Sequence, residues 1–146
     1  VDGEPLPLYG DGRQCRDWLS VYDHAAGIQH VFEQGEPGTV YNVGGGNERE
    51  NITVAEQIVA TLGKSRSLIR FVQDRPGHDR RYSIDCRRLR ALGWSPQVPF
   101  EEGLKQTVEW YRTHESWWRT IKSGEFKDYY QQQYAKRLQQ GTACGL

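Results

Sequence analysis

The alternation of short strand-like segments with amphipathic helical segments constrains the fold of this chain more than any other feature. Residues 17–21, 39–43 and 68–72 are predicted to be strands, and helical patterns separate and follow them. Strands that alternate with helices are typical of an α/β fold. Three short strands form too small a sheet for both of its faces to be covered well. We therefore expect some of these strands to pair with another part of a longer protein.

Capping residues and apolar periodicity locate the helices. Asp23 is predicted to cap a helix that runs to about Gln34. Thr53 and Glu56 stand three residues apart and predict a capping box at the start of the next helix. Residues 6–9 are expected to be extended, and further helices are expected at 85–92, 101–113, 116–122 and 126–138. The C-terminal half is therefore mainly helical, and residues 139–146 are expected to form a flexible tail.

Composition excludes several classes of partner. The formal net charge of the 146-residue chain is zero and no basic helix is visible, so neither nucleic acid nor an anionic membrane surface is expected to bind. No apolar run is long enough to span a bilayer. The 3 cysteines form no CxxC pair and the 4 histidines show no metal-ligand spacing, so no metal site is predicted. This use of cysteine fits a reducing cytoplasm.

The segment Asp74–Tyr82, with the sequence DRPGHDRRY, gathers cations around a turn. Pro76-Gly77 forces the turn. Each of the segment's arginines can donate two N–H groups to phosphate oxygens, and its histidine adds a further donor. A rigid turn that concentrates cations suits a fixed dianion. A solvated surface loop held by salt bridges explains the same composition equally well, whereas nucleic-acid binding is weakened by the neutral total charge.

Two other positions are candidate binding residues, and each has an ordinary structural explanation. Arg16 precedes Asp17 and Trp18 and could place a cation at the edge of a pocket with an aromatic wall. Taken alone, this motif is better explained by an ordinary turn with Trp18 in the core. Asn51, just before a predicted helix start, could donate a hydrogen bond to a phosphate, although a plain turn residue is at least as well supported.

The glycines Gly44-Gly45-Gly46 follow a predicted strand, as phosphate-binding loops do. Their spacing fits neither the G-x-G-x-x-G fingerprint nor the P-loop, so binding of a dinucleotide or ATP by this loop alone is rejected. The sequence also lacks recognisable catalytic patterns. No Lys stands four residues after any Tyr, and no Ser-His-Asp or Cys-His arrangement has supporting context. We therefore predict no catalytic and no cofactor-binding residue in this chain.

The order of these segments resembles one family. The segments are Pro5–Gly12, Arg16–Leu19, Tyr41–Gly45, Asp74–Tyr82, Leu92–Trp94 and Phe100–Gly103. Together they resemble the C-terminal part of the dTDP-glucose 4,6-dehydratases, which are extended short-chain dehydrogenases/reductases (SDRs). The likeness covers roughly residues 4–138, and the unbroken DRPGHDRRY is the part that separates these dehydratases from their relatives.

The resemblance implies a fold and a reaction. Residues 1–138 would form the nucleotide-sugar-binding region of an extended Rossmann-type fold, and residues 38–44 would be an edge strand of a Rossmann sheet that this chain lacks. The family binds NAD on an N-terminal Rossmann domain, oxidises the sugar at C4, eliminates water across C5–C6 and returns the hydride to C6. The product is a 4-keto-6-deoxy sugar nucleotide, a precursor of rhamnose and other deoxy sugars.

The resemblance also implies the residues of the binding site. The thymine of dTDP-glucose would be lined by Pro7 and Tyr9. The diphosphate and the neighbouring ribose would be held by Arg16, Asn51, Arg75 and His78.

The departures from the family limit what this chain is expected to do alone. The NAD fingerprint, the Tyr-x-x-x-Lys pair and the Asp-Glu acid/base pair of the family belong to an N-terminal half that is absent here. We therefore expect the isolated chain to bind no NAD and to be catalytically inactive, with a Rossmann half as its missing partner and a homo-oligomer as a possible assembly. Two alternatives remain open: a fragment of a related nucleotide-sugar epimerase or decarboxylase, and a stand-alone, non-catalytic binding or assembly module.

Overall fold

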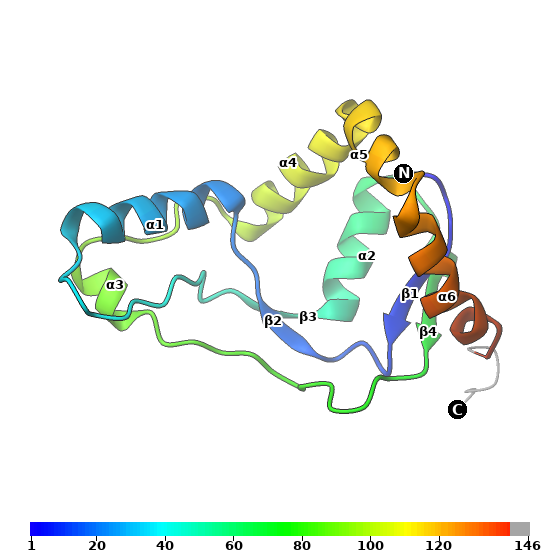
Figure 1. Cartoon of the computed structure of the whole chain (residues 1–146), viewed down its shortest axis with the longest axis horizontal. Helices are drawn as coiled ribbons and strands as arrows, with labels where there is room; N and C mark the ends of the chain where they lie inside the picture. Colours follow the sequence, from blue (N-terminus) through cyan, green and yellow to red (C-terminus); the bar gives the residue numbers. More distant parts are fainter. Residues whose placement is uncertain (141–146) are drawn as a thin grey trace.

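The strands of the chain lie in two separate two-stranded sheets (Figure 1). The computed structural model describes residues 1–140. In one sheet β1 (Leu6–Tyr9) pairs in parallel with β4 (Ile69–Val72), and in the other β2 (Cys15–Asp17) pairs antiparallel with β3 (Glu48–Glu50). The extended segment at 6–9 is confirmed, and the strand predicted at 68–72 begins one residue later.

Helices make up most of the remaining described chain. They are α1 (Val21–Gln34), α2 (Asn51–Thr61), η1 (Arg66–Leu68), α3 (Arg87–Ala91), α4 (Phe100–Thr113), α5 (Glu115–Lys122) and α6 (Glu125–Gln140). The mainly helical C-terminal half is therefore confirmed. The first two residues of the predicted tail 139–146 belong to α6, so the tail begins later than predicted, and residues 141–146 lie outside the described residues.

The strand predicted at 17–21 is wrong, because only residues up to Asp17 face a pairing partner in β3. The helix α1 begins at Val21 instead. Its N-cap is Ser20, whose hydroxyl accepts a hydrogen bond from the N–H of Tyr22 at 3.3 Å. Asp23, the predicted cap, is only 5% exposed and accepts hydrogen bonds from another part of the chain.

The strand predicted at 39–43, and as an edge strand at 38–44, is not formed within the described residues. The segment lies beside the start of α3 and is held there by contacts that involve side chains: Asn42 donates to the carbonyl of Asp85 at 2.9 Å, and Arg88 donates to that of Val40 at 3.3 Å. A strand needs the backbone edge of a neighbouring strand to bond with. No described segment offers one here.

The start of α2 also differs from the prediction. The helix begins at Asn51, two residues before the predicted capping box at Thr53, and no side chain caps it. Loop carbonyls take that role, since the N–H of Asn51 donates to Gln14 at 3.0 Å and the N–H of Ile52 donates to Gly12 at 2.8 Å. In α3 the N-cap is Cys86, but the predicted Asp85 does accept the N–H of Arg87 at 2.9 Å.

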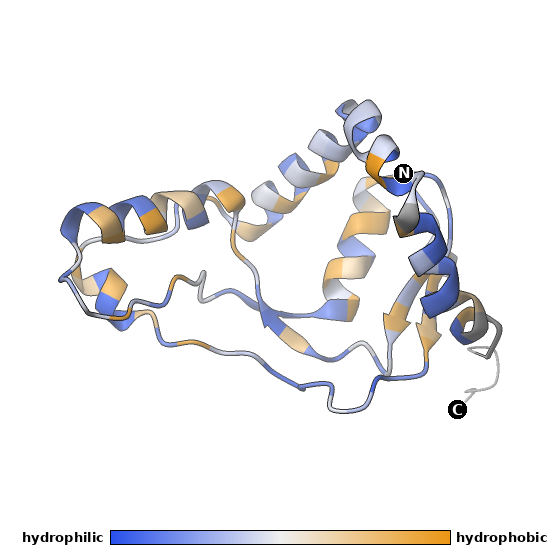
Figure 2. Cartoon of the chain, viewed as in Figure 1, coloured by the Kyte–Doolittle hydropathy of each residue, from blue (hydrophilic) through white to orange (hydrophobic). Residues whose placement is uncertain are grey.

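Two groups of buried residues hold the chain together. In the first, Ala55 and Val59 of α2 pack with Ile69 of β4, and Leu6 and Leu8 of β1 pack against them. Apolar residues accordingly concentrate on α2, β1 and β4 (Figure 2). The second group lies at the other end of the molecule, around α1 and α3, where Leu89 is fully buried and Trp94 is 7% exposed. No described helix combines the length and the apolar character that crossing a membrane requires.

Asp23 connects α1 to the segment that leads into α4. Its carboxylate accepts the N–H groups of Gln97 at 3.0 Å and Val98 at 2.9 Å. The substitution Asp23→Ala should lower the free energy of unfolding by about 3 kcal/mol, because two backbone donors lose a charged acceptor. Chemical denaturation measures this change.

Asp128→Ala is the control for this prediction, because Asp128 is exposed on α6 and makes no hydrogen bond with a described residue. It should leave the free energy of unfolding within about 0.5 kcal/mol of the original value. If Asp23→Ala changes it as little, the carboxylate does not hold the two segments together.

Candidate functional site

Strand β2 holds the DRPGHDRRY loop and β3 on its two edges. On one edge the N–H of Cys15 donates to the carbonyl of Arg80 at 2.8 Å, and the N–H of Tyr82 donates back to Cys15 at 3.2 Å. On the other edge β2 pairs with β3, which runs directly into α2. The loop and the start of α2 therefore lie on either side of one short strand.

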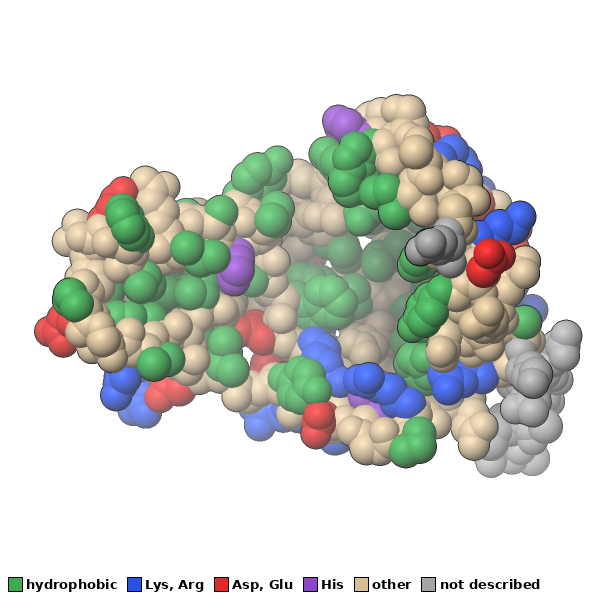
Figure 3. All heavy atoms as spheres, viewed as in Figure 1, with side chains coloured by type: hydrophobic (Ala, Val, Ile, Leu, Met, Phe, Trp, Pro, Cys, Tyr) green, Lys and Arg blue, Asp and Glu red, His purple; other side chains and the backbone are tan. Residues whose placement is uncertain are grey.

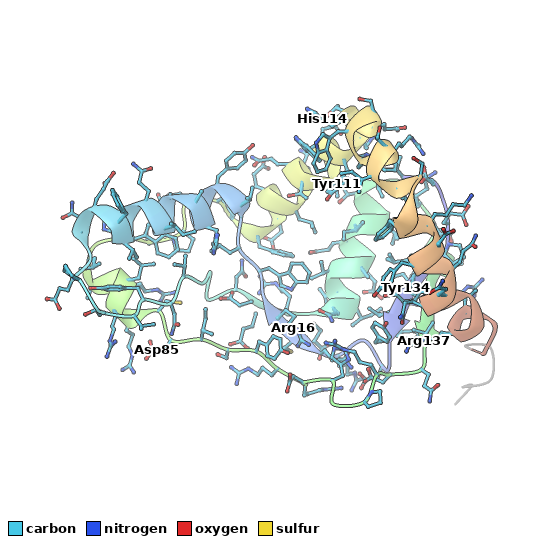
Figure 4. All side chains as sticks on the ribbon, viewed as in Figure 1. Arg16, Asp85, Tyr111, His114, Tyr134 and Arg137 are labelled. Atoms are coloured by element: carbon cyan, nitrogen blue, oxygen red, sulfur yellow. The ribbon has the colours of Figure 1, made fainter. Side chains whose placement is uncertain are left out.

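Arg16, in the middle of β2, has a fixed guanidinium. It donates to the carbonyl of Cys15 at 2.6 Å and to that of Asp79 in the loop at 3.0 Å. Its guanidinium carbon lies 4.2 Å from the centre of the Tyr82 ring. The hydroxyl of Tyr82 donates to Asp79 at 2.7 Å, and this hydrogen bond raises the pKa of Tyr82 above its ordinary value. The arginine is thus oriented before any ligand arrives (Figure 4).

His78 is the most enclosed residue of the loop, with 6% of its side chain exposed. Its Nδ1 lies 2.6 Å from Oδ1 of Asp74, and its ring meets the ring of Tyr9 edge-on at 5.9 Å. Partial burial opposes ionisation of Asp74, but the hydrogen bonds from His78 and from the N–H of Arg75 outweigh it and lower the pKa of Asp74. Asp74 is therefore an ionised acceptor at neutral pH.

Two residues of α6, which the sequence analysis did not select, complete the surroundings of Tyr9. Arg137 donates to the Tyr9 hydroxyl at 2.8 Å, and that hydroxyl donates to Tyr134 at 3.3 Å (Figure 4). The hydrogen bond with Tyr9, followed by burial, raises the pKa of Tyr134 to about 12. Tyr134 and Arg137 stand three residues apart and so share one helix face, which is the only sequence signal that could have indicated them.

The remaining predicted residues border the same region. Asn51 is the first residue of α2, and its side chain makes no hydrogen bond with a described residue. Arg75 is exposed, and its guanidinium likewise has no partner among residues 1–140. Pro7 precedes Tyr9 by two residues on β1, so both side chains point to the same face of the sheet.

The surface-loop interpretation holds for two of the loop's arginines. Arg80 pairs with Asp11 at 2.8 Å, and Arg81 pairs with Glu48 through two hydrogen bonds of 2.5 and 2.8 Å. The hydrogen bonds from Arg81 and then Ser83 lower the pKa of Glu48. These two arginines therefore form ion pairs that hold the loop, as predicted for a surface loop held by salt bridges. The guanidinium of Arg75 has no such partner among the described residues.

The triple glycine does not have the geometry of a dinucleotide-binding loop. The carboxylate of Asp17 fills it, accepting the N–H groups of Gly46 at 3.1 Å and Asn47 at 2.7 Å. A Cβ on Gly44 would lie 2.6 Å from that carboxylate, so close packing against β2 explains this glycine. Two amides of the loop are therefore already engaged by Asp17.

A cavity of about 800 Å³ lies between β1 and the helices α2, α4, α5 and α6. Pro7 and Tyr134 lie on its wall, together with mainly apolar and aromatic side chains. In the space-filling view the middle of the molecule is hollowed, and Lys and Arg side chains line the lower rim (Figure 3). Within residues 1–140 no cluster of three His, Cys, Asp or Glu side chains could hold a metal ion.

Comparison with known proteins identifies the family. The sequence model described as GDP-mannose 4,6 dehydratase matches residues 2–107. The chain belongs to this family. Among its members, dTDP-glucose 4,6-dehydratase of Xanthomonas campestris pv. campestris is 50% identical over 135 residues, which is 86% of this chain and 38% of that protein. The chain therefore spans about two fifths of the length of such relatives.

Solved structures agree with the family, and this chain is more similar to a dehydratase structure than to an epimerase structure in both sequence identity and TM-score. The dTDP-glucose 4,6-dehydratase of Streptomyces venezuelae, with NAD and TYD bound, matches 82% of this chain and 38% of its own with a TM-score of 0.78 and 45% identity. The UDP-glucose 4-epimerase of Thermotoga maritima with UDP-glucose matches 76% of this chain and 36% of its own, with a TM-score of 0.70 and 30% identity. The resemblance to dTDP-glucose 4,6-dehydratases and the α/β extended SDR fold class are confirmed.

The Glu48–Arg81 pair of this family member should hold the loop against β2 and β3. In Glu48→Gln the neutral amide can no longer bond both nitrogens of Arg81 as a carboxylate does. We expect the N–H of Tyr82 to exchange with solvent severalfold faster, as measured by amide hydrogen exchange.

Glu56→Gln is the matched control, since Glu56 pairs with Arg66 of η1 instead. It should leave exchange of the Tyr82 amide unchanged. Equal exchange rates in the two variants and the original chain would show that the Glu48 pair does not fix the loop.

Proposed function

We propose that this chain binds the dTDP part of a dTDP-sugar and is the nucleotide-sugar-binding portion of a dTDP-glucose 4,6-dehydratase. The observation that carries the proposal is the fixed guanidinium of Arg16, which lies between two backbone carbonyls and the Tyr82 ring. An arginine held in this way has already lost its rotamer freedom, so less entropy remains to be lost on binding.

The diphosphate would be held by Arg16, Arg75 and Asn51, with His78 beside them. The Arg75 guanidinium and the Asn51 amide have no partner among the described residues, so their donors remain for phosphate oxygens. Asn51 is the first residue of α2, where the helix dipole favours negative charge. Two arginines match the two charges of a diphosphate and bind its oxygens with paired N–H groups.

The thymine would lie against Pro7 and Tyr9. Tyr9 is held by Arg137 and Tyr134 of α6, so its ring is a fixed surface for a flat base. The wall of the neighbouring cavity, to which Pro7 and Tyr134 belong, is mainly apolar and suits a base better than a sugar.

The chemistry of the dehydratase would come from a Rossmann half supplied by further polypeptide. Val21, Ile28 and Phe32 of α1 are 71%, 54% and 90% exposed, and their spacing places them on one face of the helix. An apolar stripe of this kind needs a covering partner. Residues 38–44 also lie beside α1, with Val43 against Gly27, and would complete the edge of the partner's sheet. In this assembly the partner would bind NAD, and the product would be the 4-keto-6-deoxy sugar nucleotide for deoxy-sugar synthesis.

Binding of dTDP tests the site itself. Isothermal titration of the chain with dTDP should give micromolar affinity, and Arg75→Ala should weaken it about tenfold or more, because a charge-assisted contact is lost. Arg87→Ala is the control, since Arg87 is exposed on α3 and, among the described residues, pairs only with Asp85. Absence of binding, or equal losses in both variants, would contradict the proposal.

Formation of the 4-keto sugar tests whether turnover requires a Rossmann half in addition to this chain. With NAD and dTDP-glucose, the chain alone should yield no product that has lost one water, as followed by mass spectrometry. Addition of the Rossmann half of a dTDP-glucose 4,6-dehydratase should restore turnover, and Phe32→Asp should abolish that restoration because it places a charge in the apolar contact.

Gln29→Asp, on an exposed part of α1 outside the stripe, should leave the restored turnover intact. Turnover by the chain alone would overturn the predicted inactivity. Failure of the Rossmann half to restore turnover, with dTDP binding intact, would favour the alternative of a stand-alone binding module.

A further inference from the structure

Asp74, the first residue of the DRPGHDRRY loop, accepts three hydrogen bonds and is the centre of a polar network. Its Oδ1 accepts from Nδ1 of His78 at 2.6 Å and from the N–H of Arg75 at 2.8 Å, while its Oδ2 accepts from Nε2 of Gln14 at 2.9 Å. One carboxylate thus joins two proposed ligand-binding residues to the segment that precedes β2.

Two neighbouring residues, Gln14 and Gly10, accommodate the carboxylate of Asp74. Gln14 is only 3% exposed, and its Oε1 is buried with no partner among the described residues, at a cost of about 1–3 kcal/mol. The Nε2 of Gln14 thus donates to Asp74, although this orientation leaves the Oε1 of the same side chain without a hydrogen bond. Gly10 lies beside it with a φ of 58°, and a Cβ there would approach Oδ2 of Asp74 to 2.7 Å. Any other residue at position 10 would displace the carboxylate.

The contact with Asp74 decides which nitrogen of His78 faces the ligand. A carboxylate only accepts hydrogen bonds, so Nδ1 of His78 must carry the proton that it shares with Asp74. The ring is further held by the edge-on contact with Tyr9 at 5.9 Å. Nε2 then remains, and it makes no hydrogen bond with a described residue although the side chain is 94% enclosed. In the imidazolium form Nε2–H donates to a phosphate oxygen while Nδ1–H stays on Asp74.

We propose that Asp74 is a positioning residue, which fixes His78 so that Nε2 is presented to an oxygen of the bound nucleotide diphosphate. The inference rests on the proposed binding of dTDP and adds to it a residue with no ligand contact of its own. Gln14 supports the same orientation from behind.

The protonation of the ring nitrogens tests the orientation without any ligand. Two-bond ¹H–¹⁵N spectra of the full chain, recorded at a pH above the range in which histidine titrates, show which nitrogen carries the proton. We expect Nδ1–H for His78, identified by its loss in His78→Gln. His30 provides an internal reference of the opposite kind, because its Nε2 faces the carbonyl of Leu92 at 2.9 Å and must donate to it.

Two variants of Asp74 separate orientation from general structure. In Asp74→Ala we expect a mixture of the two tautomers and about tenfold weaker binding of dTDP. Asp74→Asn keeps an acceptor oxygen for Nδ1–H, and the Gln14 amide can turn to match it. This variant should therefore keep the tautomer and bind within about threefold of the original chain. Asp128→Ala is the control and should change neither measurement.

Gln14→Leu leaves Asp74 in place but removes the hydrogen bond from the Gln14 amide to its carboxylate. This variant should weaken binding of dTDP about threefold.

The outcomes distinguish this inference from the proposed function. If the original chain binds no dTDP, the proposed function fails, and with it the role assigned to Asp74, whatever the ring spectra show. If dTDP binds but Asp74→Ala keeps the Nδ1–H tautomer and the original affinity, only the positioning role is overturned. An Asp74→Asn variant as weak as Asp74→Ala would also overturn it, because charge rather than orientation would then be the requirement. If Asp74→Ala does not fold, the result for Gln14→Leu decides between the same two conclusions.

Discussion

The backbone pairing on both edges of β2 is the constraint on which the rest of the site depends. One edge of this three-residue strand bonds the DRPGHDRRY loop through Cys15, and the other pairs with β3. Because β3 runs straight into α2, the same ladder also places Asn51 at the start of that helix. A strand with only one paired edge would leave either the loop or the helix start without a fixed position.

Charged residues in this region divide into those that pair with another described residue and those that do not. Asp17 fills the glycine loop, and Arg80 and Arg81 are engaged by Asp11 and Glu48. These pairs are exposed and contribute little stability individually, but together they fix the path of the loop. Arg16 is held by two backbone carbonyls and the Tyr82 ring, whereas the guanidinium of Arg75 has no partner among the described residues.

Local patterns in the sequence predicted those elements whose formation depends on neighbouring residues. The extended segment at 6–9 and the amphipathic helix α4 are examples, since periodicity and turn residues suffice to indicate them. The predictions were wrong where a distant partner decides. The start of α2 is set by the carbonyls of Gln14 and Gly12, and residues 39–43 form no strand because no described edge meets them. Tyr134 and Arg137 reach Tyr9 from more than a hundred residues away in sequence, and although their spacing places them on one helix face, no local pattern indicates this contact with Tyr9.

A titration with dTDP followed by ¹H–¹⁵N correlation spectra of the backbone and the arginine and asparagine side chains tests whether the residues around β2 form a nucleotide-binding site. We predict that the shifted signals are confined to one site, formed by β1, β2, the start of α2, the loop and the facing side of α6. The residues concerned are Tyr9, Arg16, Asn51, Arg75, His78, Tyr134 and Arg137. Signals of α1 and α3 should stay unchanged. Shifts concentrated on the apolar stripe of α1, or no shifts at saturating dTDP, would contradict it.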